Sequence, residues 1–233
     1  MASEFAFFFA NGGGHKQKAG GFISKSKIDA AGLTIEGYIK SQMQEYFDSY
    51  DIIYADNHNI EVSEMKSYRK LKIPVRYVKT TDIFVTGTPI LIRTLEGDAE
   101  AVACEGIHLM IGISGEVYPI KLEKFRSSYM QISAAEALEA EFTFNYTYSP
   151  TVKNKITGEV IELITHSKSC VATGEVSILA KPLMRNTKVF TAWNPDGYMY
   201  GSAGDYLAVK AEDINDVYII QKDIFVKTYN QST

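Results

Sequence analysis

The sequence predicts an α+β fold made mainly of antiparallel strands, and three observations support this prediction. The chain has 233 residues, of which 45% are hydrophobic and 22% charged, so it contains enough apolar material for a folded core. Its 15 Tyr and 12 Phe outnumber a single Trp, and aromatic side chains favour the half-buried surface of a sheet. One N-terminal segment has helical periodicity, whereas the remainder consists of short β-prone runs broken by turn residues.

The principal helix is expected near the N-terminus, at about residues 34–50. Its apolar residues recur at spacings of three and four, which is typical of an amphipathic helix. These residues are Ile35, Tyr38, Ile39, Met43, Tyr46 and Phe47. A polar and charged stretch at residues 57–70 then indicates a boundary. The expected parts are an N-terminal piece at 1–60, a first β unit at 70–131, a connecting β segment at 132–177 and a second β unit at 178–233.

The two β units look like copies of one another. When residues 105–129 are placed on residues 203–229, Gly106 falls on Gly204 and a set of expected core residues coincides. The coinciding pairs are Val117 and Val217, Tyr118 and Tyr218, Phe125 and Phe225, Tyr129 and Tyr229, and further upstream Phe84 and Phe190. Each copy is expected to end in a short helical turn that its Phe and Tyr hold against the strands. The alternative is that two hairpins have converged on one design.

The second copy also resembles a short module, often called PGDYG-type, that occurs in bacterial and phage proteins. The resemblance rests on AGDYL and DIFVKTY within residues 203–229, and Ala203 stands where the name of the module has proline. It implies a fold, points to a phage or mobile-element origin, and brings no activity with it.

The overall charge limits which partners the chain can attract. With a formal net charge of -4 and a sequence pI near 5.6, the chain has no global positive field, so any nucleic-acid binding must be local. The run at residues 67–79 interleaves basic and aromatic residues, as surfaces that track single strands do. A strand with one solvated face has the same pattern.

The N-terminus and the cysteines indicate the compartment. The apolar run before Asn11 is short and lacks the basic flank of a signal peptide, and no window is long enough to span a bilayer. We therefore expect a cytoplasmic protein without a membrane partner, whose Cys104 and Cys170 are reduced structural thiols. His108 and His166 each lie four residues from a cysteine, about 13 Å along a strand, which is too far to activate a thiol.

The most distinctive local motif is GGGHKQKAGGF, at residues 12–22. Consecutive glycines leave their backbone N–H groups free to converge on an anion, because no β-carbon blocks the approach. The candidate phosphate-binding residues are Gly12, Gly13, Gly14 and His15, with Lys16 and Lys18 supplying local positive charge. The alternative is a flexible glycine turn with a surface histidine, since glycine-rich matches are weak signals by themselves.

Residues 4–22, EFAFFFANGGGHKQKAGGF, resemble the closing motif of the DHH phosphoesterase superfamily. In that family the GGGH segment belongs to the C-terminal, DHH-associated domain and binds the phosphate or terminal nucleotide of the substrate. The resemblance therefore gives this role to residues 12–15, whereas Lys18 departs from the small residue that the family keeps. The family's catalytic half, with its Asp-His-His cluster for two metal ions, would lie upstream of residue 1.

No catalytic residue, metal site or cofactor is predicted within the chain itself. Two-metal hydrolysis needs several carboxylates and imidazoles around one centre, and the four histidines are scattered. His58, with Asp56 and Glu61 nearby, is the one cluster of metal-like composition, although polar turns have the same composition.

Two functions from different classes fit these observations. The first is non-catalytic binding of a phosphate-bearing ligand, a nucleotide or a single-stranded nucleic-acid end, by a fragment related to DHH phosphoesterases. Any phosphoesterase activity would then need a separate DHH catalytic protein as a partner. The second is a structural or protein-interaction module built on the duplicated β unit, with the GGGH segment only a turn and a homo-oligomer as a further expected assembly.

Overall fold

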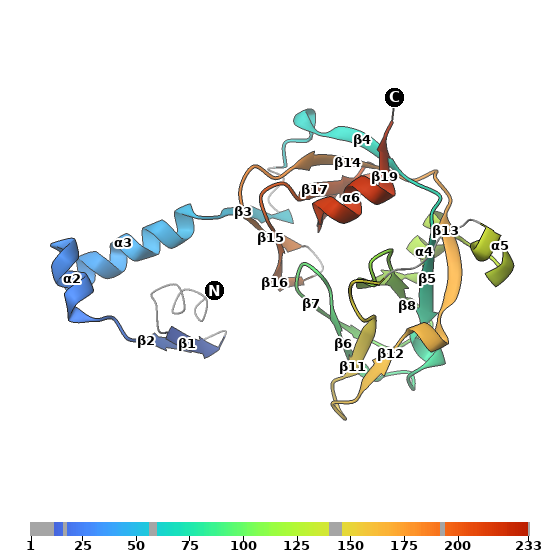
Figure 1. Cartoon of the computed structure of the whole chain (residues 1–233), viewed down its shortest axis with the longest axis horizontal. Coiled ribbons are helices and arrows are strands. Elements are labelled where there is room, and N and C mark those ends of the chain that lie inside the picture. The colour runs from blue at the N-terminus through green and yellow to red at the C-terminus, as the bar shows by residue number, and fades with distance from the viewer. Residues whose placement is uncertain (1–11, 16–17, 56–59, 140–145, 192–193, 233) are drawn as a thin grey trace. The chain divides into compact units, whose positions relative to one another are not determined.

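A computed structural model of the chain describes residues 12–15, 18–55, 60–139, 146–191 and 194–232. The expected α+β class is confirmed, because the paired strands are antiparallel, strands are the commonest regular element and helices are few (Figure 1). Two compact units are present, which are Met1–Ile52 with Arg185–Thr187, and Ile53–Met184 with Lys188–Thr233. Among the described residues, no helix combines the length and apolar character needed to cross a bilayer.

The first unit contains a hairpin followed by two helices. Its elements are β1 (Gly12–His15), β2 (Lys18–Gly21), α2 (Lys25–Ala31) and α3 (Ile35–Asp48). Helix α3 is the predicted principal helix, and Thr34 caps it by accepting a hydrogen bond of 3.1 Å from the Gly37 N–H. Helix α2 ends at Gly32, which has a φ of 66° that glycine adopts without strain.

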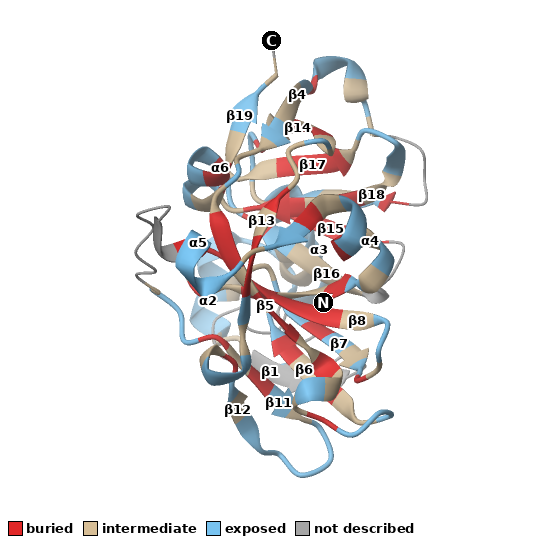
Figure 2. Cartoon of the chain, turned by 90° about the vertical axis from the view of Figure 1, so that its right-hand side faces the viewer, coloured by how far each residue is buried: buried red, intermediate tan, exposed pale blue. Residues whose placement is uncertain are grey.

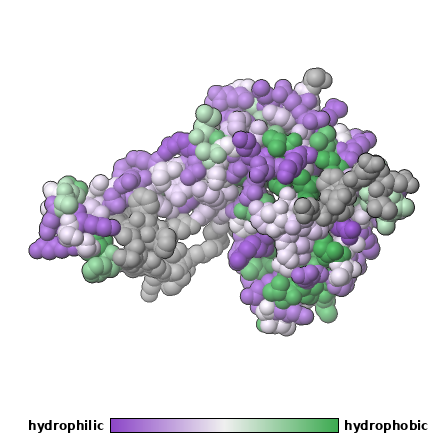
Figure 3. All heavy atoms as spheres, in the orientation of Figure 1, coloured by the Kyte–Doolittle hydropathy of each residue, from purple (hydrophilic) through white to green (hydrophobic). Residues whose placement is uncertain are grey.

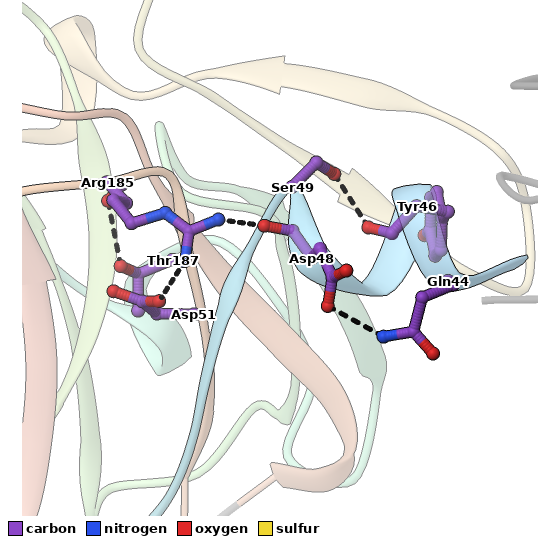
Figure 4. A network of polar contacts seen from close by, with 7 residues as sticks. All are labelled: Gln44, Tyr46, Asp48, Ser49, Asp51, Arg185 and Thr187. Carbon is purple, nitrogen blue, oxygen red and sulfur yellow. Dashed lines mark hydrogen bonds and ion pairs between the residues drawn. The ribbon is translucent and has the colours of Figure 1, made fainter. Parts of the chain in front are cut away.

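A network of polar contacts closes the C-terminal end of α3 (Figure 4). The Ser49 hydroxyl donates to the Tyr46 carbonyl over 2.6 Å, so it satisfies one of the carbonyls that the helix end leaves free. Arg185 donates to the main-chain oxygen of Asp48 and forms an ion pair of 3.2 Å with Asp51. These contacts explain why a short segment far along the chain belongs to the first unit.

Two five-stranded sheets with short helices dominate the second unit. The first sheet has the order β10 (Tyr129–Gln131), β13 (Lys168–Ala172), β5 (Pro74–Lys79), β8 (Ile107–Ile111) and β9 (Val117–Lys121). The second sheet has the order β19 (Tyr229–Gln231), β4 (Lys66–Lys70), β14 (Ser177–Pro182), β17 (Tyr206–Lys210) and β18 (Asp213–Ile220). Helix α4 (Leu122–Ser128) follows β9, and helix α6 (Lys222–Thr228) follows β18.

The two sheets repeat one design residue by residue. In the first sheet Met110 pairs with Tyr77 on one side and with Tyr118 on the other. In the second sheet Ala208 pairs in the same way with Ala180 and with Tyr218. Strand order agrees, and the registers agree except for an irregularity at Val209 and Lys210 in the second sheet, so the repeated β unit expected from the sequence is present.

Each repeat contributes one strand to the sheet of the other repeat. Strand β4 runs almost directly into β5 along the chain, yet β4 lies in the second sheet and β5 in the first. In the same way β13 precedes β14 but lies in the first sheet. We therefore take the first repeat as residues 66–131 and the second as residues 168–231, joined by a reciprocal exchange of strands.

Smaller elements are inserted into and between the repeats. A four-stranded sheet has the order β12 (Val160–Glu162), β11 (Thr151–Asn154), β6 (Pro89–Arg93) and β7 (Asp98–Val102). A three-stranded sheet has the order β16 (Asn194–Gly201), β15 (Thr187–Thr191) and β3 (Asp51–Tyr54). The remaining elements are α5 (Ala134–Glu139) and the 3-10 helices η2 (Val62–Glu64), η3 (Thr80–Asp82) and η4 (Ile164–His166).

The expected equivalence of Phe84 and Phe190 is wrong. Phe84 comes after η3 and is buried beside the four-stranded sheet, whereas Phe190 lies within β15, is half-buried and stacks on Tyr54 at 4.9 Å between ring centroids. The insertions differ in length between the repeats, so a local sequence match across them placed two unrelated positions together.

Buried side chains concentrate on the central strands of both repeats (Figure 2). The core of the first repeat contains Tyr77, Met110 and Phe125, and that of the second contains Ala208 and Phe225. Phe125 is 3% exposed and Phe225 is 2% exposed, so each fixes the helix that carries it against its sheet. The aromatic residues shared by the two copies are therefore core positions.

Candidate functional site

The candidate phosphate-binding residues lie on the N-terminal hairpin. Strands β1 and β2 pair antiparallel, with Gly12 opposite Gly21, Gly13 opposite Gly20 and His15 opposite Lys18. The hairpin thus places His15 and Lys18 at directly facing positions, next to the three-glycine strand. Lys16 lies outside the described residues.

The hairpin offers backbone donors along an edge. Its sheet has two strands, so within the described part of the chain each strand is paired on one side only. Alternate residues of an antiparallel strand direct their N–H groups toward the partner strand and away from it. About half of the N–H groups of β1 therefore face outward, and the glycines add no β-carbon to obstruct an approaching anion.

The structure describes only part of the residues considered for catalysis. Asp56 and His58 lie outside the described residues, and the described part of the chain contains no group of three or more His, Cys, Asp or Glu that could hold a metal ion. Cys170 is buried in β13, and burial raises its thiol pKa to about 12, so the reactive thiolate is absent near neutral pH. Cys104 is half-buried and, like Cys170, forms no disulfide.

The basic and aromatic run at residues 67–79 is divided between the two sheets. Tyr77 is fully buried, and Tyr68 packs edge-on against Phe225 with 4.8 Å between ring centroids. Arg76 donates to the Ser167 hydroxyl over 2.9 Å. The aromatic side chains of the run at residues 67–79 therefore pack within the protein and are not free to stack on bases. This agrees with the interpretation of the run as strand.

A lysine among four tyrosines marks the junction of the two repeats. The tyrosines are two equivalent pairs, Tyr118 with Tyr218 and Tyr129 with Tyr229, and Lys70 comes from β4. The Lys70 ammonium donates to the Tyr129 hydroxyl over 2.7 Å and to the Tyr118 hydroxyl over 3.4 Å. It also lies 5.3–5.9 Å from the ring centroids of Tyr118, Tyr129 and Tyr229, within the range of cation–π attraction.

The protonation states in this cluster follow from its surroundings. Burial tends to lower the pKa of Lys70, but Tyr118, Tyr129 and Tyr229 together outweigh it and raise that pKa well above its ordinary value. Burial raises the pKa of Tyr118, Tyr218 and Tyr229. The cluster therefore holds one ammonium ion and neutral phenols at neutral pH. The equivalent of Lys70 in the first sheet is Ala172, because Lys70 pairs with Tyr229 as Ala172 pairs with Tyr129.

Sequence reasoning found the tyrosines of this cluster but missed the lysine. The tyrosines recur in both copies, so the sequence alignment detects them. The second copy has alanine, Ala172, at the position of Lys70, so the alignment does not detect the lysine. Comparison with family models, curated proteins and solved structures finds no match for this chain.

Proposed function

We propose that the chain binds phosphate-bearing ligands, either nucleotides or single-stranded nucleic-acid ends, through the β1–β2 hairpin, and does not hydrolyse them itself. The observation that carries this proposal is the register of the hairpin, which sets His15 opposite Lys18 beside three consecutive glycines. A cationic side chain and outward backbone N–H groups are the two kinds of donor that recur at phosphate sites. The resemblance to DHH-associated domains supports the same ligand class.

Binding without turnover agrees with the chemistry available in the chain. Phosphodiester hydrolysis by two metals needs a cluster of carboxylates and imidazoles, and the described residues provide none. We expect no hydrolysis of bis-p-nitrophenyl phosphate or of a short oligonucleotide with manganese or magnesium. Metal-dependent hydrolysis that His58→Ala abolishes would contradict this part of the proposal, and a separate Asp-His-His protein is the expected catalytic partner.

The binding proposal is tested by calorimetric titration of a mononucleotide and a 5′-phosphorylated oligonucleotide at low salt. Gly13→Val adds a β-carbon to the glycine strand, and His15→Ala removes a donor, so each is expected to weaken binding about tenfold. Lys25→Gln is the matched control, since it removes one exposed charge from the same unit outside the hairpin. Binding should strengthen as pH falls through about 6.5, because an anion favours the charged imidazole.

Unchanged affinity in folded Gly13→Val and His15→Ala variants would contradict the proposal and favour the second candidate function, a structural or interaction module. The observation that favours this alternative is the exchange of strands, which makes the second unit one interlocked scaffold. Figure 3 shows apolar residues gathered between hydrophilic ones on the visible face of that unit. Sedimentation of the full chain over a range of concentrations would detect the homo-oligomer that this alternative allows.

A further inference from the structure

The first repeat contains a cavity of about 140 Å³ between strands β5, β8 and β10 and helix α4. Its lining combines apolar side chains, Leu122 and Phe125, with the charged side chains of Lys79, Glu105 and Arg126. His108 and Gln131 complete the lining, and His108 is 3% exposed. The cavity belongs entirely to the second unit, so it is separate from the N-terminal hairpin.

At the equivalent place in the second repeat, a larger side chain stands in the position of His108. Lys79 faces His108 in the first sheet as Pro182 faces Tyr206 in the second, so Tyr206 occupies the position of His108. The Tyr206 ring stacks on Phe225 with 3.7 Å between centroids and an interplanar angle of 7°. The His108 and Phe125 rings lie 5.1 Å apart at 58°. The smaller, tilted imidazole therefore leaves the space that tyrosine fills in the other copy.

The charged residues of the cavity are also particular to the first repeat. By the same registers, Lys79 corresponds to Pro182. The sequence alignment that places Gly106 on Gly204 and Phe125 on Phe225 matches Glu105 with Ala203 and Arg126 with Val226. None of these three charges belongs to the fold that the repeats share, because the second repeat forms the same strands and helix without them. Within the described part of the chain, their side chains form no hydrogen bond or ion pair with one another or with other residues.

The electrostatics of the lining favour an anion with a single charge. Burial lowers the pKa of His108, with Lys79 lowering it further, and these effects outweigh the Ile107 backbone, Asp82 and Glu105, which raise it. The imidazole is therefore neutral at neutral pH, and its Nδ1 is buried without a hydrogen-bond partner. Two cations and one carboxylate then give the lining a net positive charge of one.

We infer that the cavity of the first repeat binds a small organic carboxylate. A cavity of similar size, about 150 Å³, is known to hold a benzene ring, so the ligand's hydrocarbon part is about that large and packs on Leu122 and Phe125. Arg126 presents a planar fork that matches a carboxylate, and Lys79 adds a second positive charge. Glu105 repels a doubly charged phosphate more strongly than a monoanion, so the site favours the monoanion.

The test compares three small probes by titration of the full chain, followed by NMR or calorimetry. Benzoate and benzamide have nearly the same shape and differ in charge, so benzoate is expected to bind at least about tenfold more tightly than benzamide. Inorganic phosphate is expected to bind more weakly than benzoate. Glu105→Gln should narrow the gap between phosphate and benzoate, because it removes the repelling carboxylate.

Two substitutions transfer residues of the second repeat to the first. Arg126→Val is expected to weaken benzoate binding at least about tenfold, since it removes a charge-assisted hydrogen bond. His108→Tyr should abolish binding by filling the cavity as Tyr206 does. Lys227→Gln, which removes an exposed charge from α6, is the matched control and should leave benzoate binding unchanged.

The inference is overturned if the folded wild-type chain binds benzoate no better than benzamide. It is equally overturned if Arg126→Val and His108→Tyr both leave benzoate affinity unchanged, because the ligand then binds elsewhere. These outcomes are independent of the hairpin, so failure of one site leaves the test of the other intact.

Discussion

The two repeats share strand order and strand pairing, and they differ in the side chains at several equivalent positions of those strands. The shared residues, such as Phe125 and Phe225, are buried and hold a helix onto a sheet. Two of the differing pairs are Lys70 against Ala172 at the junction and His108 against Tyr206 at the cavity. The comparison separates what the fold requires from what one copy has acquired, since a feature needed for folding appears twice.

The single lysine at the junction has a physical reason. The four tyrosines around it come from both repeats, so the cluster is one site that the copies form together. A second lysine in place of Ala172 would bring another ammonium group toward the same tyrosines, and like charges in a partly buried place repel strongly. The symmetry of the repeats is therefore broken where a symmetric arrangement is electrostatically unfavourable.

The largest expected effect on stability comes from replacing the two equivalent phenylalanines, Phe125 and Phe225, by alanine. A buried Phe→Ala change costs about 3–5 kcal/mol of unfolding free energy. Phe225 stacks on Tyr206 at 3.7 Å, whereas the nearest ring to Phe125 is Tyr77 at 4.5 Å. Phe225→Ala should therefore lie at the upper end of the range and Phe125→Ala, beside an existing cavity, at the lower end.

Urea unfolding of both variants measures this difference. The exchanged strands also predict that the two repeats unfold in one transition, because neither sheet is complete without the other copy. Equal destabilisation by the two substitutions would show that the cavity does not loosen the packing around Phe125. Two separate transitions would show that the repeats fold independently despite the exchange.

A smaller effect is expected from Lys70→Met, which keeps the length of the side chain and removes its charge. The phenolic oxygens of Tyr118 and Tyr129 then lose the ammonium donor and keep the hydrogen bond of 3.2 Å between them, and the expected loss is about 1–3 kcal/mol. Lys66→Met on the same strand is the control, since Lys66 is exposed, and it should cost little. A stability equal to that of wild type would mean that the cluster does not depend on the ammonium group.

The same variant has a predicted pH signature. The folded-state pKa of Lys70 is raised above its ordinary value of 10.5, so the folded protein holds this proton more tightly than the unfolded chain. Its contribution is fully present below about pH 10.5 and is lost as pH rises through the folded-state pKa. The stability difference between wild type and Lys70→Met should therefore be constant near neutral pH and shrink in strong alkali.

The sequence predicted those parts of the fold that rest on local pattern. Helix α3 has an apolar stripe at helical spacing, and the repeats are visible because Tyr118, Phe125 and Tyr129 recur in the second copy. Helix α2 was missed, since its seven residues, KSKIDAA, form no such stripe. The exchange of β4 and β13 was also missed, because the sheet in which a strand pairs depends on contacts distant in sequence.

The candidate sites show the same division. The hairpin residues could be chosen as candidates from their local motif, since consecutive glycines followed by histidine suggest anion binding before any fold is known. The cavity was not predicted, because Lys79, His108 and Arg126 lie on three different elements and share no spacing rule. From the sequence alone, His108 could be considered only as a base that would activate Cys104, and that role was excluded. The structure shows that His108 lies opposite Lys79 and that Tyr206 takes the position of His108 in the second repeat, and these two facts identify His108 as a cavity residue.

The smallest expected effect concerns Glu96, which lies in the turn between β6 and β7 of the first repeat. Its main-chain oxygen accepts a hydrogen bond of 2.8 Å from the Tyr200 N–H, on β16 of the second repeat, so the two insertions meet at this residue. Burial is the largest cause that raises the pKa of Glu96, and the carboxylates of Glu116 and Asp205 add to it. Hydrogen bonds lower the pKa, and the net result is a rise from 4.5 to about 7. The carboxyl group is therefore poised to titrate near neutral pH.

Glu96→Gln should stabilise the protein at pH 8 by about 1–2 kcal/mol and have little effect at pH 5. The folded-state pKa is raised, so the folded protein binds more protons than the unfolded chain between pH 4.5 and about 7. Stability from this group is present below pH 4.5 and is lost as pH rises through 7. Urea midpoints at both pH values measure the effect, with the exposed Glu123→Gln on α4 as control. If Glu96→Gln keeps the pH dependence of wild type, the contact between the insertions is open to water, and this carboxylate is solvated in the folded state.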